Sequence, residues 1–421
     1  MQTREQRLAI DLNRLHGSEA VNNPAGMVDA LVRATHAARA SDVHIDPLGD
    51  GTSRIRVRID GALHDATSLA EEPTRHLFNQ VKVLAGIPPA TMFTPEEAHW
   101  LASVGPGTVD VRATLVPTVT GAKLALRLLY DELVLRHPEE LGLSPEDSAC
   151  LAAWLEQANG LVLVVGPTGS GKTTTVNALA QALAEDRHQH VVSIEDPVEY
   201  VLPGVTQMEL DRRHALSFSR ALPAALRIDP DCLVIGETRD LESCRACTTT
   251  AANGRVVLSS MHARDTVAAV TRLRHWRVSD SEIAAALSVV MAQRLVRRLC
   301  PACRRQAAPD DAMRRWLRCA GVDDEIEAWE PVGCEDCANT GFSGRLALFE
   351  IWHPDREDYD AIAAGADAMR LRDRLRQRGR RLIDDAMARV AEGATSLHEI
   401  RAAGLVEASA LTDVSCERSG R

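Results

Sequence analysis

Residues 161–185 read LVLVVGPTGSGKTTTVNALAQALAE and carry the clearest structural pattern in the chain. The first five of these residues are all apolar, which is typical of a short strand buried on both faces. The next eight, GPTGSGKT at 166–173, fit the pattern G-x-x-x-x-G-K-[ST], and a helical segment follows them. A strand, a glycine-rich loop and a helix in this order predict a phosphate-binding loop.

The residue types in this loop suit the chemistry of a nucleotide triphosphate. Glycines allow backbone N–H groups to surround phosphate oxygens at a helix N-terminus, Lys172 adds a positive charge near the β and γ phosphates, and the Thr173 hydroxyl can hold Mg²⁺. The alternative is a glycine-rich turn without a ligand, which the flanking pattern disfavours. The predicted nucleotide-binding residues are Gly166, Pro167, Thr168, Gly169, Ser170, Gly171, Lys172, Thr173 and Thr174.

Three further short apolar runs lie downstream, separated by helical stretches, at 191–194, 232–235 and 256–258. Each is brief enough to be a buried parallel strand. The pattern therefore predicts an α/β core in which parallel strands alternate with helices.

Polar side chains stand where these predicted strands end. Glu195 and Asp196 follow the first run, Glu237 follows the second, and His262 follows the third. Phosphate-loop catalysis needs a carboxylate on the metal side and a group that orients the attacking water, and both lie at the carboxyl ends of neighbouring strands. We predict Glu237 as the general base. A solvated cap remains the alternative for each acid, and a structural role remains open for His262.

Composition limits the class of protein. The chain has 421 residues, which at about 100 to 200 residues per domain predicts two to four domains. Its net charge is −11, so a nucleic acid or an anionic membrane surface is a poor first partner. The sequence contains neither an initial apolar run of signal-peptide length nor the roughly 20 apolar residues of a spanning helix, and we expect a cytoplasmic protein.

Changes in pattern along the chain predict six segments. A helical period at 27–39 and strand-like segments at 54–59, 108–115 and 124–129 indicate a small α+β domain ahead of the core. The predicted organisation is an N-terminal extension at 1–24, the small α+β domain at 25–135, the core at 136–298, a tetracysteine subdomain at 299–345, a C-terminal helical region at 346–411 and a polar tail at 412–421.

Four cysteines form two C-x-x-C pairs, Cys300 with Cys303 and Cys334 with Cys337. Four thiolates close a tetrahedral Zn²⁺ shell with no open position, so such a site holds a fold together and performs no hydrolysis. We predict zinc here, with four reduced buried thiols as the alternative. The C-x-x-C at 244–247 falls in a predicted helix with no further ligand, where cysteine acts as a small apolar residue.

Several segments together resemble the secretion ATPases of type II secretion and type IV pilus assembly, a hexameric branch of the RecA-like P-loop motors. The resemblance covers nearly the whole chain. It rests on GPTGSGKTTT at 166–175, SIEDPVEY at 193–200, RIDPDCLVIGETRDLES at 227–243, VVLSSMHARD at 256–265, AQRLVRRLCPAC at 292–303, and on ASDVHIDP at 40–47, RVRIDGAL at 56–63 and VDVRATLVPT at 109–118 in the small domain.

The resemblance implies roles for individual residues. Glu237 matches the catalytic glutamate, Glu195 an acidic residue near the metal and the water, and His262 the histidine on the γ-phosphate side. In the family, arginines of the small domain approach the nucleotide, and Arg112 and Arg127 occupy the matching positions. A surface strand position is the alternative for both arginines.

The chain also departs from the family pattern. It reads PEEAH at 95–99 where the family usually has PQDGR, it has Ala122 where a glutamate is usual, and Arg255 replaces the first histidine of the histidine box. These changes leave the phosphate loop and the base intact but put the contacts of the small domain in question. Only about 25 residues precede the small domain, so we expect the extra N-terminal docking domain of many relatives to be missing.

The resemblance implies a Mg²⁺- and ATP-dependent motor with a structural Zn²⁺ that forms a hexameric ring and drives assembly of a pseudopilus or a type IV pilus. Its partners would be an inner-membrane platform and a docking protein, which would hold it at the periphery of the inner membrane. Two alternatives remain open. One is a weakly active ATP-binding scaffold of the same machinery, and the other is a nucleic-acid translocase, which the acidic charge and the 3% aromatic content disfavour.

Overall fold

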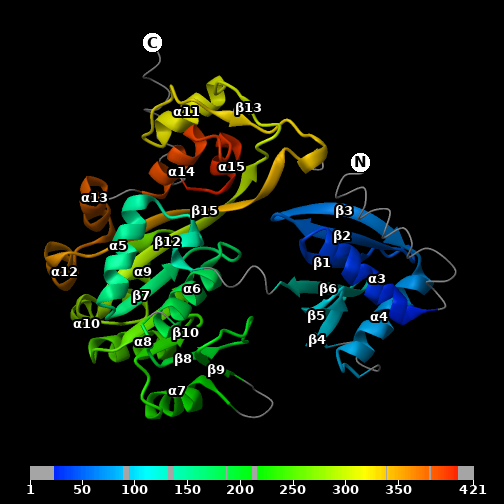
Figure 1. Ribbon diagram of the computed structural model, residues 1–421, viewed down its shortest axis with the longest axis horizontal. Helices are drawn as coiled ribbons and strands as arrows, with labels where there is room; N and C mark the ends of the chain where they lie inside the picture. Colours follow the sequence, from blue (N-terminus) through cyan, green and yellow to red (C-terminus); the bar gives the residue numbers. More distant parts are fainter. Residues whose placement is uncertain are drawn as a thin grey trace. The chain divides into compact units, whose positions relative to one another are not determined.

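A computed structural model describes residues 23–88, 94–130, 137–185, 187–210, 216–337, 339–378 and 381–405. These residues form two compact units (Figure 1). The first unit contains the described residues of 1–132, 297–305 and 331–344, and the second contains those of 133–296, 306–330 and 345–421. Each unit is described by itself below.

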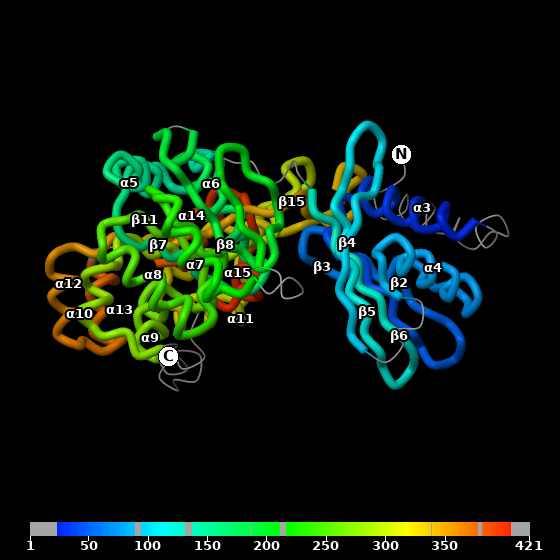
Figure 2. The backbone as a smooth tube through the Cα atoms, turned by 90° about the horizontal axis from the view of Figure 1, so that it is seen from below, coloured from blue at the N-terminus to red at the C-terminus, as the bar shows by residue number. Residues whose placement is uncertain are grey.

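The first unit is built on a six-stranded sheet in the order β3-β2-β1-β6-β5-β4. Helices α3 (Pro24–Ala37) and α4 (Glu71–Leu84) supply buried residues to the hydrophobic cluster on one face of this sheet (Figures 1 and 2). The helix and the three strands expected in this region are confirmed, with ends that differ by a few residues. The strands are β1 (Ala40–Pro47), β2 (Ser53–Ile59), β3 (Ala62–Leu69), β4 (Glu96–Val104), β5 (Gly107–Thr118) and β6 (Gly121–Leu129).

Alternation along the strands explains why this sheet has one apolar and one charged face. In β2, Ile55 and Val57 are fully buried, whereas the arginines that alternate with them are partly exposed. Successive strand side chains point to opposite faces, so the arginines stand on the face opposite the helices. The turn into β3 is Asp60-Gly61, and both residues have positive φ (48° and 85°), as a two-residue hairpin turn requires.

The second unit contains a seven-stranded sheet in the order β15-β12-β7-β11-β10-β8-β9. All neighbouring pairs from β12 to β9 are parallel, which confirms the predicted α/β core. The four predicted apolar runs are strands. The members are β7 (Leu161–Val165), β8 (Val191–Glu195), β9 (Val205–Glu209), β10 (Cys232–Ile235), β11 (Val256–Met261), β12 (Leu287–Leu299) and β15 (Phe342–Trp352).

Helices cover both faces of this sheet, which is why its strands are apolar throughout. In β7, Leu161, Leu163 and Val165 join one hydrophobic cluster, and Val162 and Val164 join another. The second cluster contains residues of α5 (Pro145–Glu156) and α6 (Lys172–Glu185). The first contains residues of α7 (Phe218–Arg227), α8 (Leu241–Ala252), α9 (Thr266–His275) and α10 (Asp280–Ala286). A short 3₁₀ turn, η3 (Pro138–Leu141), precedes α5.

The C-terminal helices pack on the same side as α8 and α9. Buried residues such as Trp316, Ile362 and Ile383 share the cluster of those helices. The helices are α11 (Asp311–Cys319), α12 (Arg356–Ala363), α13 (Ala368–Arg378), α14 (Leu382–Ala391) and α15 (Leu397–Ala402), while β13 (Arg305–Gln306) and β14 (Trp329–Glu330) form a two-stranded ladder. The tetracysteine loops, including η4 (Glu335–Cys337), group with the first unit, so the segment 299–345 is shared between units.

Residues 1–22 of the predicted extension at 1–24 and the whole predicted tail at 412–421 lie outside the described residues. The predicted domain boundaries therefore stay predictions. Over the part of the chain that is described, no helix combines the length and the apolar character needed to cross a bilayer.

Candidate nucleotide site

The phosphate loop joins β7 to α6, and Lys172 is the first residue of that helix. Gly169 and Gly171 have positive φ (76° and 87°), a conformation that only glycine adopts at low cost. At Gly166, an added Cβ would lie 2.5 Å from both the Gln293 carbonyl oxygen and Ser170 Oγ, so no side chain fits. The loop therefore requires its glycines for backbone geometry, as the motif predicts.

Buried polar groups in the loop fit an anion. Lys172 is 8% exposed, and its Nζ donates to the carbonyl oxygens of Gly166 (3.1 Å) and Pro167 (3.0 Å). Burial lowers the pKa of Lys172, with Glu237 acting in the opposite direction. Ser170 Oγ is buried and makes no hydrogen bond within the described protein. A desolvated ammonium, an unused hydroxyl and the start of a helix are the groups that bind a phosphate strongly.

The hydroxyl predicted to hold Mg²⁺ lies beside this loop. Thr173 and Thr174 are half-buried in the first turn of α6.

A cavity of about 910 Å³ borders Gly166, Pro167 and His262. Its wall includes four arginines, of which Arg264 and Arg372 pair with Asp265: Arg264, Arg272, Arg294 and Arg372.

The predicted base and the predicted histidine meet at the carboxyl ends of their strands. Glu237 follows β10 and is 19% exposed, and its Oε1 lies 2.7 Å from His262 Nε2, just after β11. His262 Nδ1 lies 3.2 Å from the Gly166 carbonyl oxygen of the phosphate loop. The parallel pairing of β10, β11 and β7 brings these three strand ends to one edge of the sheet. His262 thus lies between the Glu237 carboxylate and the phosphate loop.

Two charged residues near Glu237 were not selected from the sequence. Arg239 Nε donates to Glu237 Oε2 at 2.7 Å, and its NH1 group lies 3.9 Å from Asp196 Oδ2. Asp196 was noted only as the second member of a carboxylate pair. The signal for Arg239 was its spacing, two residues after the base on the same loop.

Glu195 is placed differently from the other predicted acid. It is 8% exposed, and its Oε1 accepts hydrogen bonds from Ser193 Oγ (2.6 Å) and Gln207 Nε2 (2.9 Å). Burial raises the pKa of Glu195, with the two hydrogen bonds acting against that shift. The described contacts bring Asp196, rather than Glu195, into the ion-pair network of Glu237. The role of Glu195 near a metal stays a prediction.

The burial of Glu195 predicts a pH-dependent stability. The pKa of Glu195 is higher in the folded protein than in the unfolded chain. The free energy of unfolding therefore falls as pH rises from the unfolded pKa of about 4.3 through the folded pKa, and below about 4.3 the burial of Glu195 causes no such loss. We expect Glu195→Gln to raise Tm by a few degrees at pH 8, with the gain disappearing near pH 4. Thermal unfolding of the wild type and of Glu195→Gln between pH 4 and pH 8 measures this difference in Tm. An equal Tm difference at every pH would contradict the conclusion that burial raises the pKa of Glu195.

The predicted arginines lie in the first unit. Arg112 of β5 and Arg127 of β6 are directly opposed across the two strands. Arg127 Nε donates to Asp42 Oδ1 at 3.0 Å, and Arg112 Nε lies 3.9 Å from Asp110 Oδ2. Like charges directly opposite each other destabilise a sheet pair unless acids or an anionic ligand compensate them.

The substitution at Arg255 lies far from the phosphate loop. Arg255 precedes β11, whereas His262 follows it, so seven residue steps of about 3.3 Å each put Arg255 about 23 Å from His262. Its Nε donates to the Pro230 carbonyl oxygen at 3.1 Å. This departure from the family pattern therefore leaves the base and the loop untouched.

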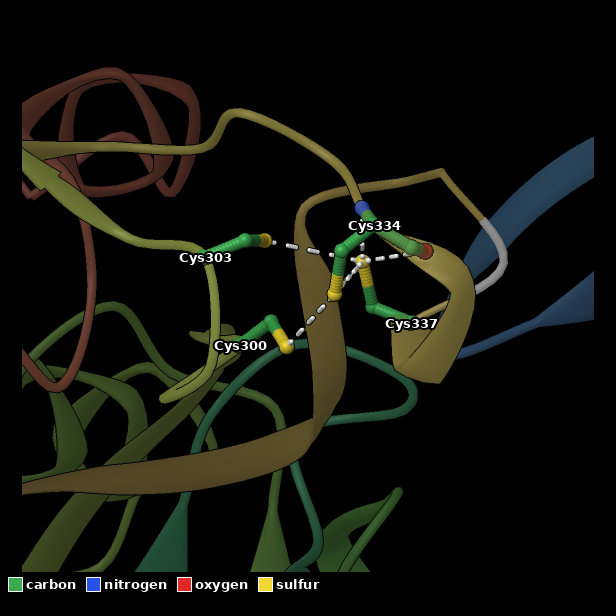
Figure 3. Close-up of side chains that lie close together, drawn as sticks. All are labelled: Cys300, Cys303, Cys334 and Cys337. Atoms are coloured by element: carbon green, nitrogen blue, oxygen red, sulfur yellow. Dashed lines mark hydrogen bonds between the residues drawn. The ribbon is translucent and has the colours of Figure 1, made fainter.

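The two cysteine pairs converge at one point (Figure 3). Sulfur–sulfur distances are 3.9 Å for Cys300 and Cys334, 3.7 Å for Cys303 and Cys337, and 3.8 Å for Cys334 and Cys337. A tetrahedron with Zn–S distances of about 2.3 Å has edges of about 3.8 Å. The backbone N–H groups of Cys334 and Gly341 both donate to Cys337 Sγ at 3.2 Å, which favours a thiolate at this position. The donor set fits a zinc ion.

The cysteines at 244–247 do not extend this set. Cys244 and Cys247 are buried in α8, and burial raises their thiol pKa values to about 12 and about 11. Protonated thiols in a hydrophobic cluster act as small apolar side chains, as the sequence suggested.

Comparison with known proteins gives the family. A family profile described as "Type II/IV secretion system protein" matches residues 21–402. The chain is 36% identical over 375 residues to the type II secretion system protein HxcR of Pseudomonas aeruginosa, covering 89% of this chain and 76% of that protein. It is 34% identical over 378 residues to the type IV pilus assembly ATPase PilB of Thermus thermophilus, covering 89% of this chain and 42% of that protein.

Solved structures agree in fold. The Legionella pneumophila ATPase DotB superposes with a TM-score of 0.66 at 21% identity, covering 90% of this chain and 96% of that chain. The pilus retraction motor PilT with bound ADP gives a TM-score of 0.59 at 20% identity, covering 89% and 96%. The sequence matches span nearly the whole chain, including the phosphate loop and Glu237, and the chain therefore belongs to the family of type II/IV secretion system proteins.

Proposed function

We propose that this protein is a Mg²⁺-dependent ATP hydrolase that works as a six-membered ring and drives assembly of a pseudopilus or a type IV pilus. The observation that carries the proposal is the junction of Glu237, His262 and Gly166, which joins an acid at a strand end to an intact phosphate loop. A glycine-rich turn without catalytic function would not need this arrangement.

In this mechanism the loop N–H groups and Lys172 hold the β and γ phosphates. Glu237 orients a water molecule in line with the γ phosphate and accepts its proton, while the water oxygen bonds to the γ phosphorus and the bond to the β-phosphate oxygen breaks. Thr173 would hold Mg²⁺, which neutralises charge on the phosphate oxygens. His262, whose Nδ1 lies 3.2 Å from the Gly166 carbonyl oxygen, senses whether the γ phosphate is present.

Arg112 and Arg127 complete the site in the closed ring. Their guanidinium groups stay charged at any working pH and pair with phosphate in a bidentate manner. Asp42 keeps Arg127 oriented through its 3.0 Å hydrogen bond. The four cysteines would hold a structural zinc, which supplies no chemistry because its shell is closed.

The partners of this motor are an inner-membrane platform and a docking protein of a secretion or pilus system. Both would hold the protein at the periphery of the inner membrane. This part of the proposal rests on the type II secretion and type IV pilus roles that the names of HxcR and PilB describe.

Mg²⁺-dependent ATP hydrolysis over a range of protein concentrations tests the proposal. We expect turnover per subunit to rise with concentration, because a ring shares its active sites between subunits. An equimolar mixture with Glu237→Gln should show less than half of the wild-type turnover, since one inactive subunit would disable its neighbours. Turnover that is independent of concentration and falls only in proportion to the inactive fraction would contradict the ring.

Two other results would favour the alternative functions, an ATP-binding scaffold or a nucleic-acid translocase. ATP binding without hydrolysis at any concentration would favour a scaffold. Stimulation by DNA that salt abolishes would favour a nucleic-acid translocase.

A further inference from the structure

The loop that carries the base is held rigidly through its backbone. The Gly236 N–H donates to the Ile194 carbonyl oxygen (3.0 Å), and the Thr238 N–H donates to the Ser260 carbonyl oxygen (2.8 Å). The Arg239 N–H donates to Ser243 Oγ (3.2 Å), within the capping box that starts α8. With its backbone bonded on both sides, the loop leaves the side chains of Glu237 and Arg239 to form the site.

The two oxygens of the Glu237 carboxylate contact groups from different elements. Oε1 faces His262, which follows β11 and reaches the phosphate loop through Gly166. Oε2 accepts from Arg239 Nε on the same loop as the base itself. The partner of Oε1 can therefore respond to a nucleotide, whereas the partner of Oε2 is tied to the loop that carries the base.

This asymmetry assigns a role to each oxygen. A glutamate side chain has several rotatable bonds. If the Glu237 side chain moved freely, its carboxylate would hold the attacking water less often in the orientation that the reaction requires. The hydrogen bond from Arg239 fixes the position of Oε2 and thereby restricts the directions in which Oε1 can point. The second contact of Arg239, to Asp196 after β8, restricts the guanidinium in turn.

We infer that Arg239 is the positioning residue of the catalytic base: it anchors Glu237 Oε2 so that Oε1 faces the water once His262 turns to the phosphate. The inference deepens the proposed function and rests on Glu237 being the base. Arg239 does not touch the reacting atoms. It is 58% exposed, so its contribution lies in orientation and little in folding stability.

The test compares Arg239→Gln, Arg239→Lys and a matched control, Arg245→Gln, which removes an exposed arginine of α8. In the full-length protein we expect Arg239→Gln to lower kcat by about 10- to 100-fold, with KM and nucleotide affinity changed less than about twofold. Arg239→Lys, which keeps the charge and loses the planar fork, should recover part of kcat. Arg245→Gln should match the wild type, and Tm should be the same in all four proteins.

The outcomes distinguish this inference from the proposed function. If Arg239→Gln keeps wild-type kcat while Glu237→Gln abolishes turnover, Arg239 is not the positioning residue and Glu237 remains the base. If Arg239→Gln loses kcat, nucleotide affinity and Tm together, its role is structural and the inference is wrong. If Glu237→Gln itself keeps its turnover, the assigned base is wrong and the inference fails with it.

Discussion

Glu237→Gln is expected to lower kcat by about 10²- to 10⁴-fold while ATP binding is retained. The substitution keeps the shape of the side chain and its contact with Arg239, but an amide cannot accept the proton of the attacking water. Nucleotide binding depends on the loop at 166–173, whose backbone geometry the change does not touch. Steady-state hydrolysis measures kcat, and equilibrium titration with a fluorescent ATP analogue measures binding.

The matched control for this prediction is Glu242→Gln, which neutralises an exposed glutamate in the first turn of α8. It should keep wild-type kcat. Equal losses in the two variants would mean that any change of charge in this region slows turnover, and the assignment of Glu237 as the base would then fall.

Removal of the metal is expected to give the largest loss of stability. Four sulfurs at tetrahedral spacing join loops that are 30 residues apart in the sequence, and a closed zinc shell contributes its binding free energy to folding. Structural zinc binds small peptides with about 10–16 kcal/mol at pH 7, so even a fraction of that amount is large beside the total stability of a domain. We expect the purified protein to contain one zinc per chain and to unfold at a markedly lower temperature after chelation.

Cys337→Ser should reproduce this effect, because three thiolates and a hydroxyl hold zinc poorly. Cys150→Ser changes a cysteine that is exposed and outside the cluster, and it should leave both the zinc content and Tm unchanged. A protein that is free of metal as purified and insensitive to a chelator would show that the four thiols are reduced and structural.

Much of the core could be predicted because its signals are local. The run at 161–165 is apolar at every position and short, and a strand covered by helices on both faces has to be so. The loop that follows needs glycine wherever φ is positive or a Cβ would collide, as at Gly166 and Gly171. Both requirements act within a few residues and can therefore be read directly from the chain.

The grouping of the segments was harder to predict. The tetracysteine loops group with the small sheet, residues 306–330 group with the core, and the predicted subdomain at 299–345 stays a prediction. Cysteine spacing predicts which residues bind a metal, but packing against other segments decides where the site belongs.

The strand–loop–helix unit at the phosphate site and the parallel core could be predicted from sequence alone, because backbone conformation and burial leave local patterns in the chain, whereas the role of Glu237 as the base stays a prediction. Only the tertiary structure decided which oxygen of Glu237 meets His262 and which meets Arg239, and that Glu195 is buried against Ser193 and Gln207. The physical reason is that side-chain partners at strand ends depend on strand order and register. Those are set by packing between segments that are distant in the sequence.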